Sequence, residues 1–87
     1  MKHYIGTIEE RNGEQEYSFN VLFKSNKPDA TLRRIALNWY DDCDNKKGED
    51  GGFYFMGGIL FTEPDRYKEI TAEEYEVIKR TGALPEL

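Results

Sequence analysis

One short run of the chain is apolar on both sides of the strand that it would form. The run reads Gly-Gly-Phe-Tyr-Phe-Met-Gly-Gly over residues 51–58 and follows an acidic stretch at 41–50. A strand with one buried face alternates apolar and polar residues, so a strand that is apolar on both sides needs cover on both. The second cover is the chain's own second helix or C-terminal tail, a second copy, or a different partner, and the sequence leaves these alternatives open.

Length and composition predict a single domain spanning residues 1–87. A chain of 87 residues builds one core. The lone Cys43 has no partner for an internal disulfide, and no run of about 18 apolar residues or export-type N-terminus stands out. We therefore expect a cytoplasmic protein.

The first half of the chain predicts a long hairpin over residues 2–24. Asn12-Gly13 is a typical type I′ turn. If Arg11 faces Glu14, nearly all the large apolar side chains of both strands share one face. The opposite face is mixed, and only Ile5 and Leu22 need cover there.

A first helix is predicted to follow this hairpin. It begins after Ser25 or Asn26 as N-cap and runs to about Asp41. Its apolar residues follow the spacing of an amphipathic helix and are Leu32, Ile35, Ala36, Trp39 and Tyr40. This stripe is expected to lie on the aromatic face of the hairpin.

The second half predicts another hairpin and a second helix. Strands at 53–56 and 59–63 are joined by Gly57-Gly58, and Pro64-Asp65 then turns the chain into an extended piece at 67–70. Thr71 and Glu74 have the spacing of a capping box, so the second helix begins at Ala72, and Gly82 ends it.

These elements predict a two-layer α+β fold with the order β-β-α-β-β-α. The sheet is mainly antiparallel and has four strands, with 67–70 as a candidate fifth, and both helices pack on one face. A right-handed crossover through the first helix places the third strand beside the first, which gives the strand order 4-3-1-2.

No group of residues points to catalysis or to a cofactor. A nucleophile needs a nearby base, and the only histidine is His3, near the N-terminus. Asp42 and Asp44 flank Cys43 and disfavour its thiolate. A calcium loop beginning at Asp42 fails because Lys46, Lys47 and Phe53 occupy three of its key positions. We expect a non-enzymatic protein without metal or cofactor.

Charge and the second hairpin together point to a protein partner. A net charge of -5 argues against binding to nucleic acid or an anionic membrane. One side of the hairpin carries Phe53, Phe55, Leu60 and Thr62, and the other carries Tyr54, Met56, Ile59 and Phe61. The set left uncovered would join Ile5 and Leu22 in an apolar patch of the kind that marks an interface.

The predicted partner-binding residues are apolar anchors with an acidic rim. The anchors are Ile5, Leu22, Phe53, Phe55 and Leu60, and the rim is Asp41, Asp42, Asp44, Glu49 and Asp50. The predicted function is that of a small acidic binding protein: an inhibitor, an immunity-type factor or an accessory protein of a mobile element. The alternative is a structural or regulatory domain that forms a homodimer.

Overall fold

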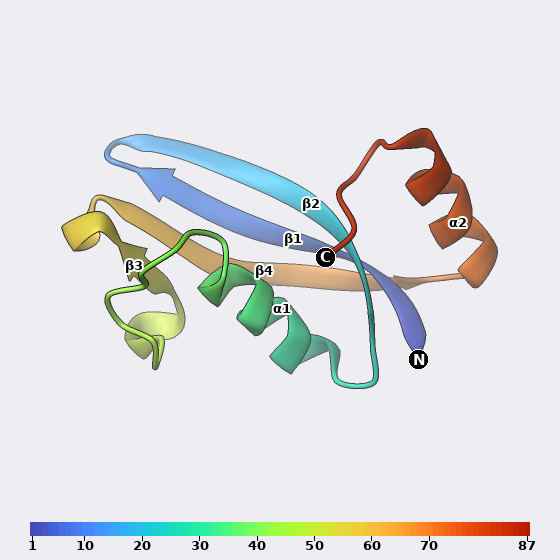
Figure 1. Cartoon of the computed structure of the whole chain (residues 1–87), viewed down its shortest axis with the longest axis horizontal. Helices are drawn as coiled ribbons and strands as arrows, with labels where there is room; N and C mark the ends of the chain where they lie inside the picture. The colour runs from blue at the N-terminus through green and yellow to red at the C-terminus, as the bar shows by residue number, and fades with distance from the viewer.

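The computed structural model describes all residues, 1–87, and confirms the α+β fold with the order β-β-α-β-β-α. Four strands form one antiparallel sheet in the order β2-β1-β4-β3 (Figure 1). The elements are β1 (Lys2–Asn12), β2 (Gln15–Ser25), α1 (Pro28–Leu37), β3 (Phe53–Phe55), β4 (Leu60–Ile70) and α2 (Ala72–Thr81), with short 3-10 turns at Glu49–Gly51 and Met56–Gly58.

The first hairpin forms as expected, but its register differs from the prediction. Asn12 pairs with Gln15, so the turn consists of Gly13 and Glu14, and Gly13 has a φ of 63°. Moving the turn by one residue shifts every cross-strand partner by two: Ile8 faces Phe19, where the prediction had Tyr17. Because side chains alternate with a period of two, this shift leaves each residue on its predicted face.

The predicted strand order is wrong in one respect: β4, not β3, lies beside β1. The reason is length. β3 has three residues, whereas β4 has eleven and pairs along β1 from His3 to Asn12. A long central strand needs partners for its backbone groups on both sides, and only β4 supplies them for β1.

Pro64-Asp65 is a bulge inside β4 and not the predicted turn. Pro64 lies opposite Ile8 and Arg66 opposite Thr7, so Asp65 is the extra residue. A bulge is one of the few places where a sheet accepts proline. The predicted strand at 59–63 and the extended piece at 67–70 are therefore one continuous strand, and no fifth strand forms.

Helix α1 covers one face of the sheet and is shorter than predicted. Its N-cap is Lys27, and the Ser25 hydroxyl accepts a hydrogen bond from the Lys27 amide at 2.8 Å. The helix ends at Leu37, four residues before Asp41. The main core lies beneath it and contains Tyr4, Ile8, Val21, Phe23, Leu32, Ile35, Ala36, Phe53, Phe55 and Leu60.

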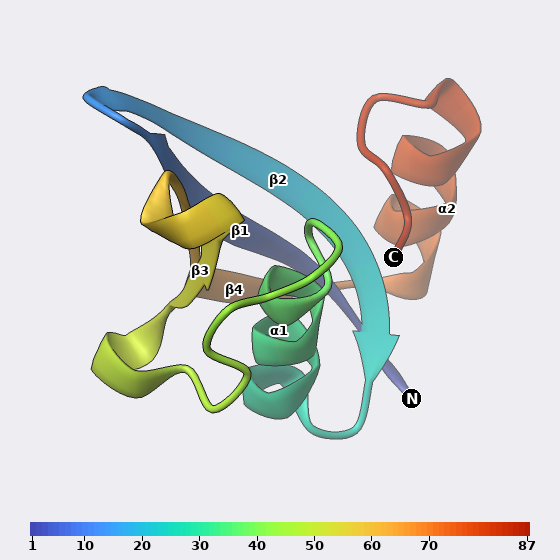
Figure 2. The ribbon, with the colours of Figure 1, turned by 60° about the vertical axis from the view of Figure 1, so that its left-hand side comes forward.

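Helix α2 packs on the opposite face, so the prediction that both helices share one face is wrong. Tyr4 belongs to the core under α1, whereas its neighbour Ile5 packs with Tyr75 of α2. Successive strand residues point to opposite faces, and in Figure 2 β2 passes between the two helices. A single residue, Thr71, separates β4 from α2, so the helix begins at the end of the strand. It therefore covers the apolar side chains nearest to that end, which are Ile5, Leu22 and Ile70.

The predicted ends of α2 are confirmed. The Glu74 amide donates to the Thr71 hydroxyl at 3.0 Å, and the Thr71 amide donates to the Glu74 carboxylate at 3.1 Å. These bonds lower the pKa of Glu74. Gly82 closes the helix with a φ of 70°.

Candidate protein-binding edge

The predicted apolar anchors are buried inside the monomer. Phe53 is 1% exposed, Phe55 0%, Leu60 7% and Leu22 0%. Ile5 is half-buried against the cluster that Leu22 forms with Tyr75. On the folded monomer these five residues therefore do not form the predicted open apolar patch.

The pairing of the second hairpin explains this burial. Phe53 lies opposite Thr62 and Phe55 opposite Leu60, as predicted, and this set faces α1. On the other side, Phe61 is covered by Arg11, whose guanidinium carbon lies 4.4 Å from the ring centre, and by the ring of Tyr54 at 4.8 Å. The side of Phe53 and Phe55 is therefore covered by α1, and Phe61 by Arg11 and Tyr54, whereas Met56 and Ile59, which the sequence placed on the same side as Phe61, are 66% and 60% exposed.

The acidic loop shields the edge of the sheet at β3. Asn45 accepts from the Tyr54 amide and donates to the Gly52 carbonyl at 3.1 Å, while the Asp44 amide donates to the Tyr54 carbonyl at 2.8 Å. The five rim residues are exposed, as predicted; they are Asp41, Asp42, Asp44, Glu49 and Asp50. Asp44 also accepts from the Gly57 amide at 2.9 Å. The loop thus has a structural role, and a role of its acids in partner binding stays a prediction.

The opposite edge of the sheet, at β2, is open over half its length. The C-terminal tail covers the edge at Leu22: the Leu22 amide donates to the Pro85 carbonyl, and the Leu22 carbonyl accepts from the Leu87 amide, both at 2.8 Å. Outward-facing backbone groups alternate along an edge strand. The same alternation directs the N–H and C=O groups of Glu16, Ser18 and Asn20 away from β1. All residues from Gln15 to Asn20 are exposed.

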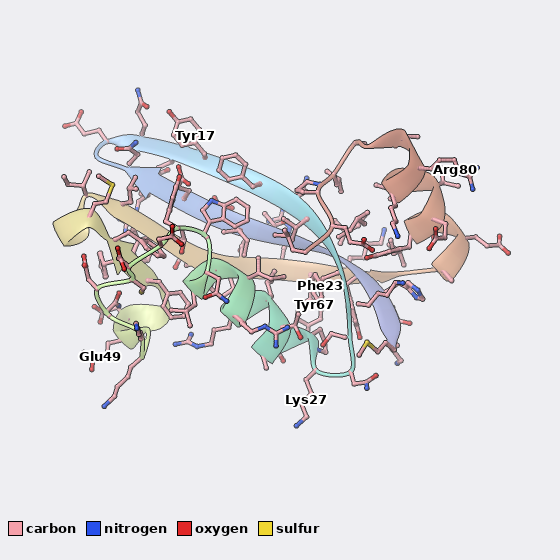
Figure 3. The ribbon with its side chains drawn as sticks, in the orientation of Figure 1. Tyr17, Phe23, Lys27, Glu49, Tyr67 and Arg80 are labelled. Carbon is pink, nitrogen blue, oxygen red and sulfur yellow. The ribbon has the colours of Figure 1, made fainter.

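Three aromatic side chains line this open half on the side of α1. Tyr17 is 42% and Phe19 38% exposed, and Tyr17 projects from the open half of β2 (Figure 3). The ring of Phe19 lies 6.3 Å from that of Tyr17 and 5.5 Å from that of Trp39. We call Tyr17, Phe19 and Trp39 the aromatic shelf.

A buried carboxylate holds Trp39 in place. Glu10 is 5% exposed, and its Oε1 accepts from Trp39 Nε1 at 3.2 Å and from the Tyr40 hydroxyl at 2.5 Å. The bond to Glu10, helped by burial, raises the pKa of Tyr40 to about 12. These two bonds explain why α1 ends early, because residues 39 and 40 turn toward β1. A buried carboxylate without such donors would be costly, so Glu10 serves as a fixed anchor for the shelf.

A groove continues from the aromatic shelf along α1. It has a volume of about 490 Å³ and is lined by Arg34, Ile35, Asn38, Trp39, Pro85 and Leu87. Trp39 belongs to both shelf and groove, so the two are continuous. The site therefore combines free backbone groups, aromatic anchors and an adjoining groove lined by both apolar and polar residues.

His3 and Cys43, which were considered as catalytic residues, both pack against other residues of the fold. The ring of His3 lies edge-on to Tyr75 at 4.9 Å. Cys43 is half-buried, as part of the cover over β3, and its thiol lies 3.7 Å from Asn45 Oδ1. No three histidine, cysteine or acidic side chains gather in a way that could hold a metal ion. No helix is long and apolar enough to cross a membrane.

Comparison with known proteins adds nothing to this geometry, because no family model, no curated protein and no solved structure matches the chain.

Reasoning from the sequence placed the shelf residues under the first helix and so missed them. The signal that reveals them is length. Eleven strand residues span about 37 Å, whereas ten helical residues span about 15 Å, so one helix cannot cover the hairpin. The far end of an overlong hairpin must lie open or meet something else.

Proposed function

We propose that this chain is a small acidic, non-enzymatic protein-binding domain that accepts an extended segment of a partner along the open half of β2. The observation that carries this proposal is the C-terminal tail, which already pairs with Leu22 through two backbone hydrogen bonds. The chain itself thus uses this edge to hold an extended segment. In strand addition, main-chain bonds supply affinity and contacts to alternate side chains supply specificity.

The aromatic shelf supports the same proposal. Tyr17 and Phe19 lie on one face of β2, so alternate side chains of an added strand would contact them. Aromatic side chains in preformed positions are common interface anchors, and the bond from Trp39 to Glu10 fixes that ring in advance. An inhibitor, an immunity-type factor and an accessory protein of a mobile element all act by binding proteins, and each is compatible with this edge.

Titration with synthetic peptides, followed by amide NMR, tests the proposal. The probe is a seven-residue peptide of alternating valine and lysine, and its control has the same length with proline at alternate positions, which cannot donate along the edge. We expect the first peptide to shift the amides of Glu16, Ser18 and Asn20 and the indole of Trp39, and the second to shift none of them.

A matched pair of variants locates the anchor. Phe19→Ala should weaken peptide binding at least threefold, whereas Val77→Ala, at an apolar residue of α2 that is 54% exposed, should leave it unchanged. Shifts confined to α2 or to the acidic loop, or no shifts at all in a monomeric sample, would contradict the proposed site.

A further inference from the structure

We propose that the segment bound at the open edge is β2 of a second copy of this chain, paired antiparallel about a two-fold axis at Ser18. This inference rests on the proposed function, because it names the partner of the same edge. The pairing would join two sheets into one continuous sheet with both copies of α1 on the same side. Two-fold dimers of this kind use the same surface patch from each copy.

The tail and the turn together select the register. Leu22 is occupied by the tail, and Glu14 lies in the hairpin turn, so the free outward-facing residues between them are Glu16, Ser18 and Asn20. Facing residues of this kind exchange two backbone hydrogen bonds per pair. With Ser18 opposite Ser18, Glu16 meets Asn20 at both ends, and all three residues of each copy are paired.

Neighbouring registers pair fewer residues. A slide of one step in one direction sets Glu16 against Leu22, where the tail is bound, and a slide in the other direction sets Asn20 against Glu14 in the turn. The Ser18 register therefore pairs more of the free residues than either neighbouring register does. At its two ends Glu14 of one copy comes level with Leu22 of the other, where the tail is bound, so the pairing stops there.

In that register the aromatic side chains also match. Tyr17 of each copy lies opposite Phe19 of the other, on the face that carries α1 and Trp39. Cross-strand aromatic pairs stabilise antiparallel sheets beyond the area they bury. The exposure of Tyr17 and Phe19 in the monomer then reflects an interface that one copy alone leaves incomplete.

The charges permit this pairing although each chain is acidic. Glu16 is the only charged residue between Gln15 and Asn20. Its counterpart in the second copy lies four residues further along the strand, about 14 Å away, which exceeds the screening length of about 8 Å at physiological salt. No like charges face one another across the pair.

Apart from the single charge of Glu16, the open half also lacks the usual protections against strand pairing. Residues 15–20 contain no lysine or proline, and their pairing with β1 has no bulge. The other edge is three residues long and covered by the acidic loop. One edge of the sheet is thus covered, and half of the opposite edge is not. This contrast supports a role for the open half of β2 in strand pairing.

Sedimentation equilibrium from 5 to 500 µM tests self-association. We expect the mass to rise toward twice the 10.2 kDa of the chain. Ser18→Pro, which removes an outward amide and no backbone bond to β1, and Ser18→Lys should each weaken association at least tenfold. Both variants also lose the exposed hydrogen bond that the Ser18 hydroxyl donates to Glu9 of β1. Asn26→Lys, at an exposed residue past the end of β2, is the charge-matched control and should associate as the wild type does. Circular dichroism checks that each variant is folded.

Cysteine cross-linking tests the register in a Cys43→Ala background. Facing residues lie about 5.5 Å apart between Cα atoms, within the range of about 4.4–6.8 Å that a disulfide spans. Mild oxidation should link Ser18→Cys to itself. Glu16→Cys should not link to itself, but a mixture with Asn20→Cys should give the mixed dimer. A dimer in which Glu16→Cys links to itself, or one that Ser18→Pro leaves intact, would overturn the inference.

The two proposals fail in different ways. A chain that stays monomeric at 500 µM, yet shows the peptide-induced shifts at residues 16, 18 and 20, overturns the second-copy inference and supports the proposed function. A chain that stays monomeric and shows no such shifts overturns both.

Discussion

The two edges of the sheet differ in how their outer backbone groups are covered. At β3 the edge is only Phe53–Phe55 long, and Asp44 and Asn45 of the acidic loop bond to its outer backbone groups. At β2 the edge is eleven residues long, and only the region of Leu22 is covered, by the tail. An edge strand presents unpaired N–H and C=O groups that bind any extended segment. The aromatic residues at β3 therefore stabilise the fold, whereas those at β2 are available for binding.

The largest expected effect separates an aromatic side chain at the covered edge from one at the open edge. Phe55 is 0% exposed in the core, and truncation of a buried phenylalanine typically costs about 3–5 kcal/mol. Phe55→Ala should therefore lower the free energy of unfolding by about that amount, measured by urea denaturation. Phe19→Ala, at the open edge, should cost about 1 kcal/mol or less. Equal losses for the two variants would show that Phe19 belongs to the core.

An intermediate effect is expected from the residue that ties the acidic loop to β3. Asn45→Ala leaves the Tyr54 amide and the Gly52 carbonyl without their partner, and an unsatisfied buried group costs about 1–3 kcal/mol. Asn20→Ala at the open edge loses one bond, from Thr7 at 2.9 Å, and should cost about 1 kcal/mol or less. Hydrogen exchange should accelerate at Tyr54 in the first variant only. Unchanged hydrogen exchange at Tyr54 in Asn45→Ala would show that the edge at β3 does not depend on the bonds from Asn45.

The smallest expected effect is a pH dependence of the contact between the C-terminal tail and β2 at Leu22. The hydrogen bond from the Tyr75 hydroxyl, with a contribution from Lys79, lowers the pKa of Glu86 below its usual 4.5. A lowered pKa in the folded state means that this stabilisation is present above pH 4.5 and is lost as the pH falls through the lowered value. NMR should show the Leu22 amide shifting in that acidic range.

Glu86→Gln is the matched control for this titration, because it keeps an acceptor for Tyr75 and removes the charge. The shift of the Leu22 amide should then lose its acidic transition. A transition that persists in Glu86→Gln would assign the pH dependence to another group, such as Glu74, whose pKa is also lowered.

Much of the fold follows from local patterns in the chain. The capping box at Thr71 and the glycine at position 82 set the ends of α2. The alternation in the first hairpin placed each side chain on its correct face even though the turn lies one residue later than expected. These predictions succeed because hydrogen bonding at a helix end and the period of a strand depend on neighbours in sequence.

The candidate site was less predictable, because its members come together only through packing. Trp39 belongs to the aromatic shelf since Glu10, twenty-nine residues earlier, accepts its indole N–H. The pairing of the tail with Leu22 joins residues still further apart in the sequence. The buried anchors show the reverse case: the apolar run at 53–56 indicated that the strand needed cover, but not that α1 covers Phe53 and Phe55 while Met56 stays exposed.

Local sequence patterns specify the element order, the side of the sheet on which each strand residue lies, and the need to bury an aromatic face of the strand at 53–55. The tertiary structure alone decided that β4 lies beside β1, that the helices cover opposite faces, and that one half of β2 is left open. The physical reason is that local propensities specify which face of an element is apolar. The relative lengths of the elements and the competition for unpaired backbone groups decide which face and which edge are actually covered.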